Sequence, residues 1–110
     1  MTWDDLLERL RLAGLHPEEL DFMENYGPIA AERHKELEGR HLRCVFGTVR
    51  LNGNLKFDVY FFPSPDDAED FARVMGARRG WQQAGNMVFG TEPEDRERLR
   101  KTLEVPLQAV

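Results

Sequence analysis

The side chains best suited to chemistry are three histidines and a single cysteine, Cys44. His41 and Cys44 offer one nitrogen and one sulfur ligand, and His34 lies seven residues before His41; His16 stands apart. A structural zinc site takes four converging ligands, usually in closely spaced pairs. One cysteine without an HExxH motif does not meet that need. We therefore expect surface histidines, a buried cysteine and no bound metal.

Thiol catalysis would require His41 to lie beside Cys44. Residues 42–51 have the composition of a strand, and side chains three apart on a strand point to opposite faces. Direct pairing is therefore not expected. Cys44 is predicted to be a core residue that shares a face with Leu42 and Phe46.

Paired carboxylates occur at Asp4-Asp5, Glu18-Glu19 and Asp66-Asp67. All three pairs fall where we expect the first turn of a helix, and acids there complement the helix dipole. There is no glycine-rich phosphate loop, and Gly90-Thr91 is better explained as a turn. We predict no cofactor, and the sequence favours a protein that is not an enzyme.

Aromatic residues on one strand give a more specific hypothesis. The candidate interaction surface consists of Tyr60, Phe62, Trp81, Arg43 and Lys56. Tyr60 and Phe62 alternate with the apolar stripe of residues 55–61 and so face away from it. Left open, they would stack bases or bind a protein. The alternative that we favour is that residues 3–23, which carry many large apolar side chains, cover this face.

Residues 1–39 are expected to form a helical N-terminal extension. Thr2 suits the cap of a first helix, with leucines on one face and Gly14 as its stop. Pro17 resembles a second helix start, ending at Gly27-Pro28. A third helix is expected over residues 29–38.

Residues 40–105 predict the order β-β-α-β-α. Asn52-Gly53 lies between β-prone runs at 42–51 and 55–62, which is typical of a hairpin. Ser64 and Pro65 are expected to begin a helix. Residues 81–89 are expected to form a strand that is interrupted at Gly85-Asn86. Thr91 to Glu94 has the spacing of a capping box, which predicts a last helix that ends at Val105-Pro106. The predicted core consists of Phe57, Val59, Phe61, Phe71 and Met75.

These elements predict one α+β domain over residues 1–110. A right-handed crossover would place strand 81–89 beside strand 42–51 in an antiparallel sheet. Both later helices would then lie on one face. The arrangement is part of a ferredoxin-like plait.

The same layout resembles a group of small uncharacterised bacterial α+β domains, some carried as lipoproteins. The matching pieces are Leu6-Leu7 to Gly14, residues 42–62, Ala68 to Met75, Trp81, and Gly85-Asn86-Met87-Val88. The resemblance implies this fold and a bacterial origin. The function of that family is open, so it implies no activity. This sequence shows neither a lipoprotein signal nor an anchoring cysteine.

The charge and hydropathy of the chain disfavour two classes of partner, nucleic acids and membranes. The chain has 110 residues and a net charge of −5, while residues 40–62 carry four bases and one acid. An acidic protein repels nucleic acid, so that partner is not favoured. No apolar run approaches ~20 residues and no signal peptide is seen, which predicts a cytoplasmic protein without a membrane partner.

The leading hypothesis is a non-enzymatic protein-interaction or self-association module. The alternative is a small-ligand binder or enzyme that uses a pocket between the sheet and residues 15–40.

Overall fold

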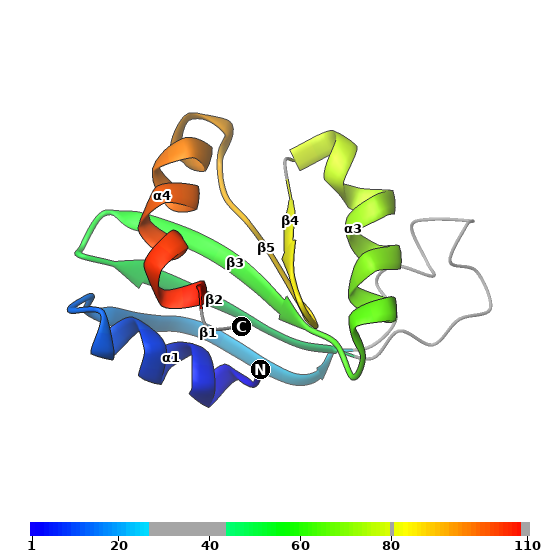
Figure 1. Cartoon of the computed structure of the whole chain (residues 1–110), viewed down its shortest axis with the longest axis horizontal. Helices are drawn as coiled ribbons and strands as arrows, with labels where there is room; N and C mark the ends of the chain where they lie inside the picture. The colour runs from blue at the N-terminus through cyan, green and yellow to red at the C-terminus, as the bar shows by residue number, and fades with distance from the viewer. Residues whose placement is uncertain (27–43, 80, 109–110) are drawn as a thin grey trace.

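The computed structural model describes residues 1–26, 44–79 and 81–108 (Figure 1). The elements in chain order are α1 (Trp3–Leu12), β1 (Pro17–Tyr26), β2 (Cys44–Leu51), β3 (Leu55–Phe61), α3 (Pro65–Arg79), β4 (Gln82–Ala84), β5 (Met87–Gly90), the 3-10 turn η2 (Pro93–Asp95) and α4 (Arg96–Leu107). The five strands pair antiparallel in the order β1-β2-β3-β5-β4. The predicted α+β class is confirmed. The helix expected over residues 29–38 lies outside the described residues.

The sheet has helices on both faces. α1 and α4 pack on one face, here called the α1/α4 face, and α3 packs on the other, the α3 face; Figure 1 shows α3 well away from the first two. The first core contains Trp3, Leu6, Leu7, Leu10, Val49, Leu51, Leu55, Phe57, Val59, Phe61, Met87, Phe89, Leu99 and Leu103. The second core contains Cys44, Phe62, Ala68, Phe71, Trp81 and Val88.

Helix α1 begins as the sequence predicts. The Thr2 hydroxyl accepts the amide of Asp5 at 3.2 Å, and the Asp5 carboxylate accepts the amide of Thr2 at 3.0 Å. Leu6 and Leu10 are fully buried against the sheet. Gly14, at φ +81°, follows the helix end in the left-handed conformation that favours glycine.

The second helix expected from Pro17 is wrong, because this segment is strand β1. Proline at the first position of an edge strand costs no ladder hydrogen bond. Pairing with β2 places Glu18 opposite Arg50, and the two side chains form an ion pair at 2.9 Å. Phe22 lies beside Trp3, with ring centroids 5.3 Å apart. These contacts join residues distant in sequence and outweigh the local helix-start signal.

The central hairpin is confirmed. Asn52 and Gly53 have φ of 51° and 82°, and the Asn54 amide donates to the Leu51 carbonyl at 3.2 Å. The alternate side chains of β3 from Leu55 to Phe61 are all at most 5% exposed on the α1/α4 face. Phe71 is buried, but the prediction that it shares a core with Phe57, Val59 and Phe61 is wrong, because it lies in the second core on the α3 face. The Met75 side chain lies outside the described part of the chain.

The predicted strand order is wrong. Residues 81–89 do not form one strand beside β2; they form the hairpin β4-β5, with a tight turn at Gly85 (φ 60°), and β5 pairs with β3. The hairpin returns the chain to the free side of β3, so no crossover past β2 is needed. α3 and α4 also pack on opposite faces, because Phe71 meets Phe62 while Leu99 joins the core of the first face.

Of the two helix caps predicted in the second half of the chain, the structure contains one. Ser64 caps α3 as predicted, since its hydroxyl accepts the amide of Asp67 at 3.2 Å. The capping box expected at Thr91 is wrong, because the Thr91 hydroxyl instead donates to the carbonyl of Lys56 at 2.6 Å. α4 also continues through Pro106, which is buried, to Leu107.

None of the described helices is long and apolar enough to cross a membrane.

Candidate binding site on the sheet

The predicted aromatic surface is largely inside the protein. Phe62 and Trp81 are 3% and 8% exposed, and Tyr60 is half-buried. The ring of Phe71 on α3 lies 4.8 Å from Tyr60 and 5.1 Å from Phe62, measured between ring centroids. This face is therefore covered, as we favoured, but α3 covers it. The covering by residues 3–23 is wrong, because α1 packs on the opposite face.

The other residues singled out in the sequence, Arg43, the histidines and Cys44, do not come together at one site in the described part of the chain. Arg43, His34 and His41 lie outside the described residues, and His16 is exposed. Cys44 is buried beside Phe62, and burial raises the pKa of its thiol to about 12. In the part of the chain that the structure describes, no group of three histidine, cysteine or acidic side chains is placed to hold a metal ion.

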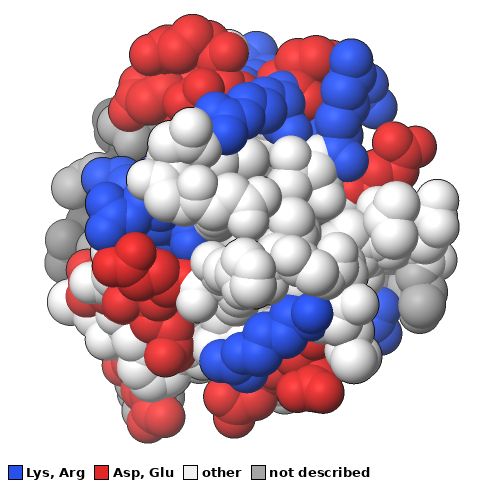
Figure 2. All heavy atoms as spheres, turned by 90° about the vertical axis from the view of Figure 1, so that its left-hand side faces the viewer, with Lys and Arg blue, Asp and Glu red and all other residues white. Residues whose placement is uncertain are grey.

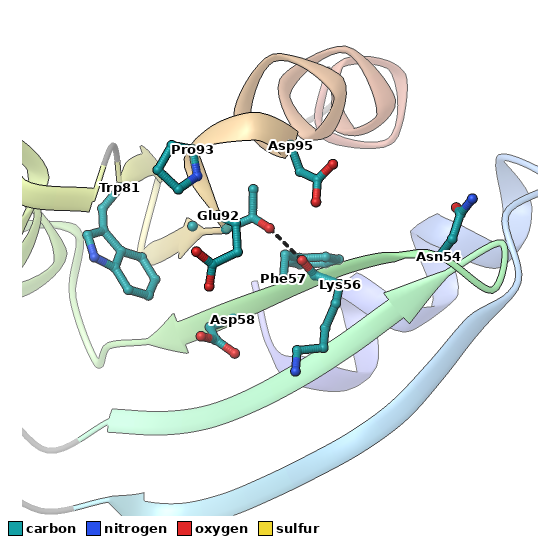
Figure 3. Close-up of a pocket in the computed structure, with 10 residues that line it drawn as sticks. Asn54, Lys56, Phe57, Asp58, Trp81, Glu92, Pro93 and Asp95 are labelled. Carbon is teal, nitrogen blue, oxygen red and sulfur yellow. Dashed lines mark hydrogen bonds between the residues drawn. The ribbon is translucent and has the colours of Figure 1, made fainter.

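A cavity of about 400 Å³ opens beside Trp81, where β5 ends and the chain crosses β3 toward α4 (Figure 3). We call it the Trp81 cavity. Its lining residues are Asn54, Lys56, Phe57, Asp58, Trp81, Gly90, Thr91, Glu92, Pro93 and Asp95. The predicted surface residues Trp81 and Lys56 thus meet at one site. None of its lining residues belongs to the described part of segment 15–40, and the rest of the pocket expected between the sheet and residues 15–40 lies outside the described residues.

Local structure fixes the walls of this cavity. Trp81 stands against Gly90, where an added Cβ would come within 2.6 Å of the indole ring. The indole N–H of Trp81 is buried and has no hydrogen-bond partner, and in Figure 3 it lies on the side of the ring away from Glu92. The Thr91 hydroxyl holds the connecting segment to β3 through Lys56. Only glycine at position 90 lets the tryptophan approach the sheet this closely.

Asp58 is the best-positioned charged group in the cavity. It faces Thr48 across β2 and β3, and the Thr48 hydroxyl donates to Asp58 Oδ1 at 2.8 Å. Thr48 is itself only 9% exposed. A buried hydroxyl that bonds one carboxylate oxygen fixes the orientation of the other. Asp58 is therefore held ready to accept a hydrogen bond from a bound group.

The charge of the cavity is negative. Asp58, Glu92 and Asp95 contribute three carboxylates against the single ammonium of Lys56. Like charges gathered around a partly enclosed space favour a cation within it. An aromatic wall adds a favourable contact for the apolar stem or the charged head of such a cation.

Sequence reasoning missed Asp58, Glu92, Asp95 and Asn54 as a group. Asp58 lies on the polar side of β3, the same side as Lys56, so alternation alone places those two together. The segment with Glu92 and Asp95 was expected to cap a helix. Its approach to β3 depends on the β4-β5 hairpin, which local patterns do not determine.

Two other surface features differ in character. At the end of the molecule where α1 ends and the β2-β3 hairpin turns, Figure 2 shows an uncharged central area bordered by both bases and acids. A smaller apolar cavity of about 270 Å³ lies near Cys44, Trp3 and Phe62. Neither has the excess of carboxylates over bases that the Trp81 cavity has.

The chain matches no family model, and no curated protein or solved structure is significantly similar to it. The resemblance to small bacterial α+β domains therefore stays a prediction.

Proposed function

We propose that this protein is a non-enzymatic interaction module that holds a basic side chain of a partner protein in the Trp81 cavity. The observation that carries the proposal is the placement of three carboxylates and one ammonium around a partly enclosed space beside Trp81. A lysine or arginine of a partner would extend its apolar stem along the indole and its charge toward Asp58.

The lining offers charged groups for binding and no nucleophile of the usual kinds. Within the described residues, it includes no cysteine, histidine or serine, and its one hydroxyl, on Thr91, is already bound to a backbone carbonyl. The Cys44 thiol is protonated at neutral pH because burial raises its pKa to about 12, so it is a poor nucleophile.

A small cationic metabolite is the second candidate, and the cavity volume favours it. About 400 Å³ lies within the range of roughly 300–1,000 Å³ that small-molecule sites occupy. The same carboxylates would bind its ammonium groups. The two candidates share one chemistry and differ in whether backbone flanking the cation adds affinity.

The test is an NMR titration that follows the indole N–H signals of Trp3 and Trp81. The probes are Nα-acetyl-arginine amide, spermidine and a short peptide with one arginine among glycines. We expect the Trp81 signal to shift and the Trp3 signal to stay. Asp58→Asn should weaken binding about tenfold or more, since hydrogen bonds to charged groups contribute roughly 1.5–3 kcal/mol.

Matched variants make the result decisive. Glu8→Gln removes one exposed acid on α1, outside the cavity lining, and should leave affinity unchanged. The protein-partner proposal expects the peptide to bind more tightly than free arginine amide, and tighter spermidine binding would favour a metabolite. No Trp81 shift with any probe, or equal affinity for Asp58→Asn, contradicts a cation site.

A further inference from the structure

The outer edge of β1 has the features of a second binding surface. β1 lies at one end of the strand order, and among the described residues no strand pairs with its outer side. Figure 1 shows it at the border of the sheet beside α1. An unpaired strand edge offers backbone amides and carbonyls to an incoming extended segment.

Three side chains of β1 are large, apolar and exposed. Leu20, Phe22 and Met23 are 39%, 43% and 43% exposed. The opposite edge of the sheet differs, since β4 has only three residues and α3 packs beside it. β1 has ten residues, with register shifts between Glu19 and Asp21 and between Met23 and Tyr26, so it offers the longer of the two edges.

A hollow of about 580 Å³ lies between α1 and β1, alongside this edge. Its lining residues are Trp3, Asp4, Glu19, Leu20, Asp21, Phe22 and Glu24. Trp3 and Phe22 form an apolar floor, with ring centroids 5.3 Å apart. The acids surround that floor, so the hollow suits a partner side chain that is apolar near its backbone and positive at its tip.

The acidic side chains of β1 determine which kind of partner segment can pair with it. β1 carries Glu18, Glu19, Asp21 and Glu24 and no base, and of these four acids only Glu18 is in an ion pair within the described chain. The Asp21 carboxylate accepts the amide of Phe22 at 2.9 Å, so this one amide of β1 already has a partner and the other amides of the outer edge must carry the pairing. Because β1 carries no base, two copies of it would bring no base opposite any acid, which opposes self-pairing.

The geometry points to β1 as a docking edge for an extended segment of a partner protein that alternates apolar and basic side chains. Its backbone adds to the sheet beside β1. Its basic side chains meet the acids of β1 on one face of the sheet, since residues three apart on a strand, such as Asp21 and Glu24, point to opposite faces. This surface is separate from the Trp81 cavity and does not depend on it.

Binding to a short peptide that alternates valine and lysine tests the inference on the full chain. The same peptide N-methylated on alternate amides keeps its charge and loses strand pairing. We expect the first peptide to protect β1 amides from hydrogen exchange and the methylated one to bind about tenfold more weakly. Equal affinity for both, or protection confined to residues around the Trp81 cavity, overturns the docking edge.

Charge reversal gives the matched protein variants. Asp21→Lys with Glu24→Lys should lose the valine–lysine peptide and gain a valine–glutamate peptide, whereas Glu104→Lys on α4 should change neither. A double variant that keeps its original preference overturns the assignment. So does concentration-dependent dimerisation of the wild-type protein that protects β1, because the occupant would then be a second copy.

Discussion

Trp3 lies directly on the backbone of Gly47, so close that a Cβ atom added at position 47 would overlap its indole ring. On the other face of the sheet, Trp81 stands against Gly90 in the same manner. Both tryptophans are at least nine-tenths buried. Each face of the sheet thus carries a tryptophan ring that lies on a strand glycine and leaves no space for a side chain there.

Gly47→Ala is expected to lower the free energy of unfolding by about 1–3 kcal/mol, because the methyl group displaces Trp3 and overpacks the α1 contact. Urea unfolding followed by circular dichroism measures the loss. In a Trp3→Leu background the same substitution should cost much less. Additive losses in the double-mutant cycle would show that the ring and the glycine are not coupled.

Phe71→Ala should cost roughly 3–5 kcal/mol of unfolding free energy, because the ring is only 2% exposed and joins α3 to the sheet. Phe22→Ala is the control, since that ring is 43% exposed and should lose far less. Chemical denaturation of both variants compares them directly. A similar small loss for each would show that α3 contributes little to the fold.

Gly53→Val should destabilise the protein by about 1–2 kcal/mol through backbone strain alone. Gly53 has φ +82°, and nothing lies within 4 Å of the place a Cβ would occupy, so no clash contributes. Gly53→Asn should be nearly neutral, because asparagine tolerates this conformation. Equal thermal midpoints for the valine and asparagine variants would exclude strain as the cause.

Acid should destabilise the protein partly through Glu18. Hydrogen bonds from Arg50 hold the pKa of Glu18 below its ordinary value of 4.5. Because the folded pKa is the lower one, this stabilisation is present above pH 4.5 and is lost as pH falls through the folded value. Glu18→Gln should flatten the decline of the melting temperature between pH 5 and pH 3, by a small amount because the pair is exposed. An unchanged slope would show that this ion pair does not contribute.

Native Cys44 should react slowly with iodoacetamide at pH 8, because burial raises its pKa to about 12 and shields the sulfur. In urea the thiol regains its ordinary pKa and the rate should rise steeply. Mass spectrometry of timed samples gives both rates. Comparable rates in the two conditions would mean that Cys44 is accessible in the folded protein.

Local signals in the sequence predicted the elements whose ends and faces depend on nearby residues. The Thr2 cap, the Asn52-Gly53 turn and the apolar face of β3 each act within a few residues, and the structure contains all three. β1 could not be predicted in this way. Pro17 and the acids after it satisfy the rules for a helix start, and only pairing with the distant β2 makes this segment a strand.

The candidate site was harder still to predict, since it forms where β3 meets the segment after β5. Lys56 and Trp81 were both recognised from their types and positions, but as parts of an exposed aromatic face. Their true neighbours Glu92 and Asp95 arrive through the β4-β5 hairpin. Strand order depends on the packing of the whole sheet, and local periodicity carries no information about it.

The shared packing of α1 and α4 on one face has a consequence for how the chain folds. The Arg9 guanidinium donates to the carbonyl of Pro106 at 3.4 Å across 97 residues of sequence, and Leu99 and Leu103 complete the core that holds Leu6 and Leu10. Contacts so distant in sequence form late and slow folding. During synthesis, the part of the α1/α4 core that Leu99 and Leu103 cover therefore stays exposed until α4 is made, which leaves apolar surface open to non-specific association.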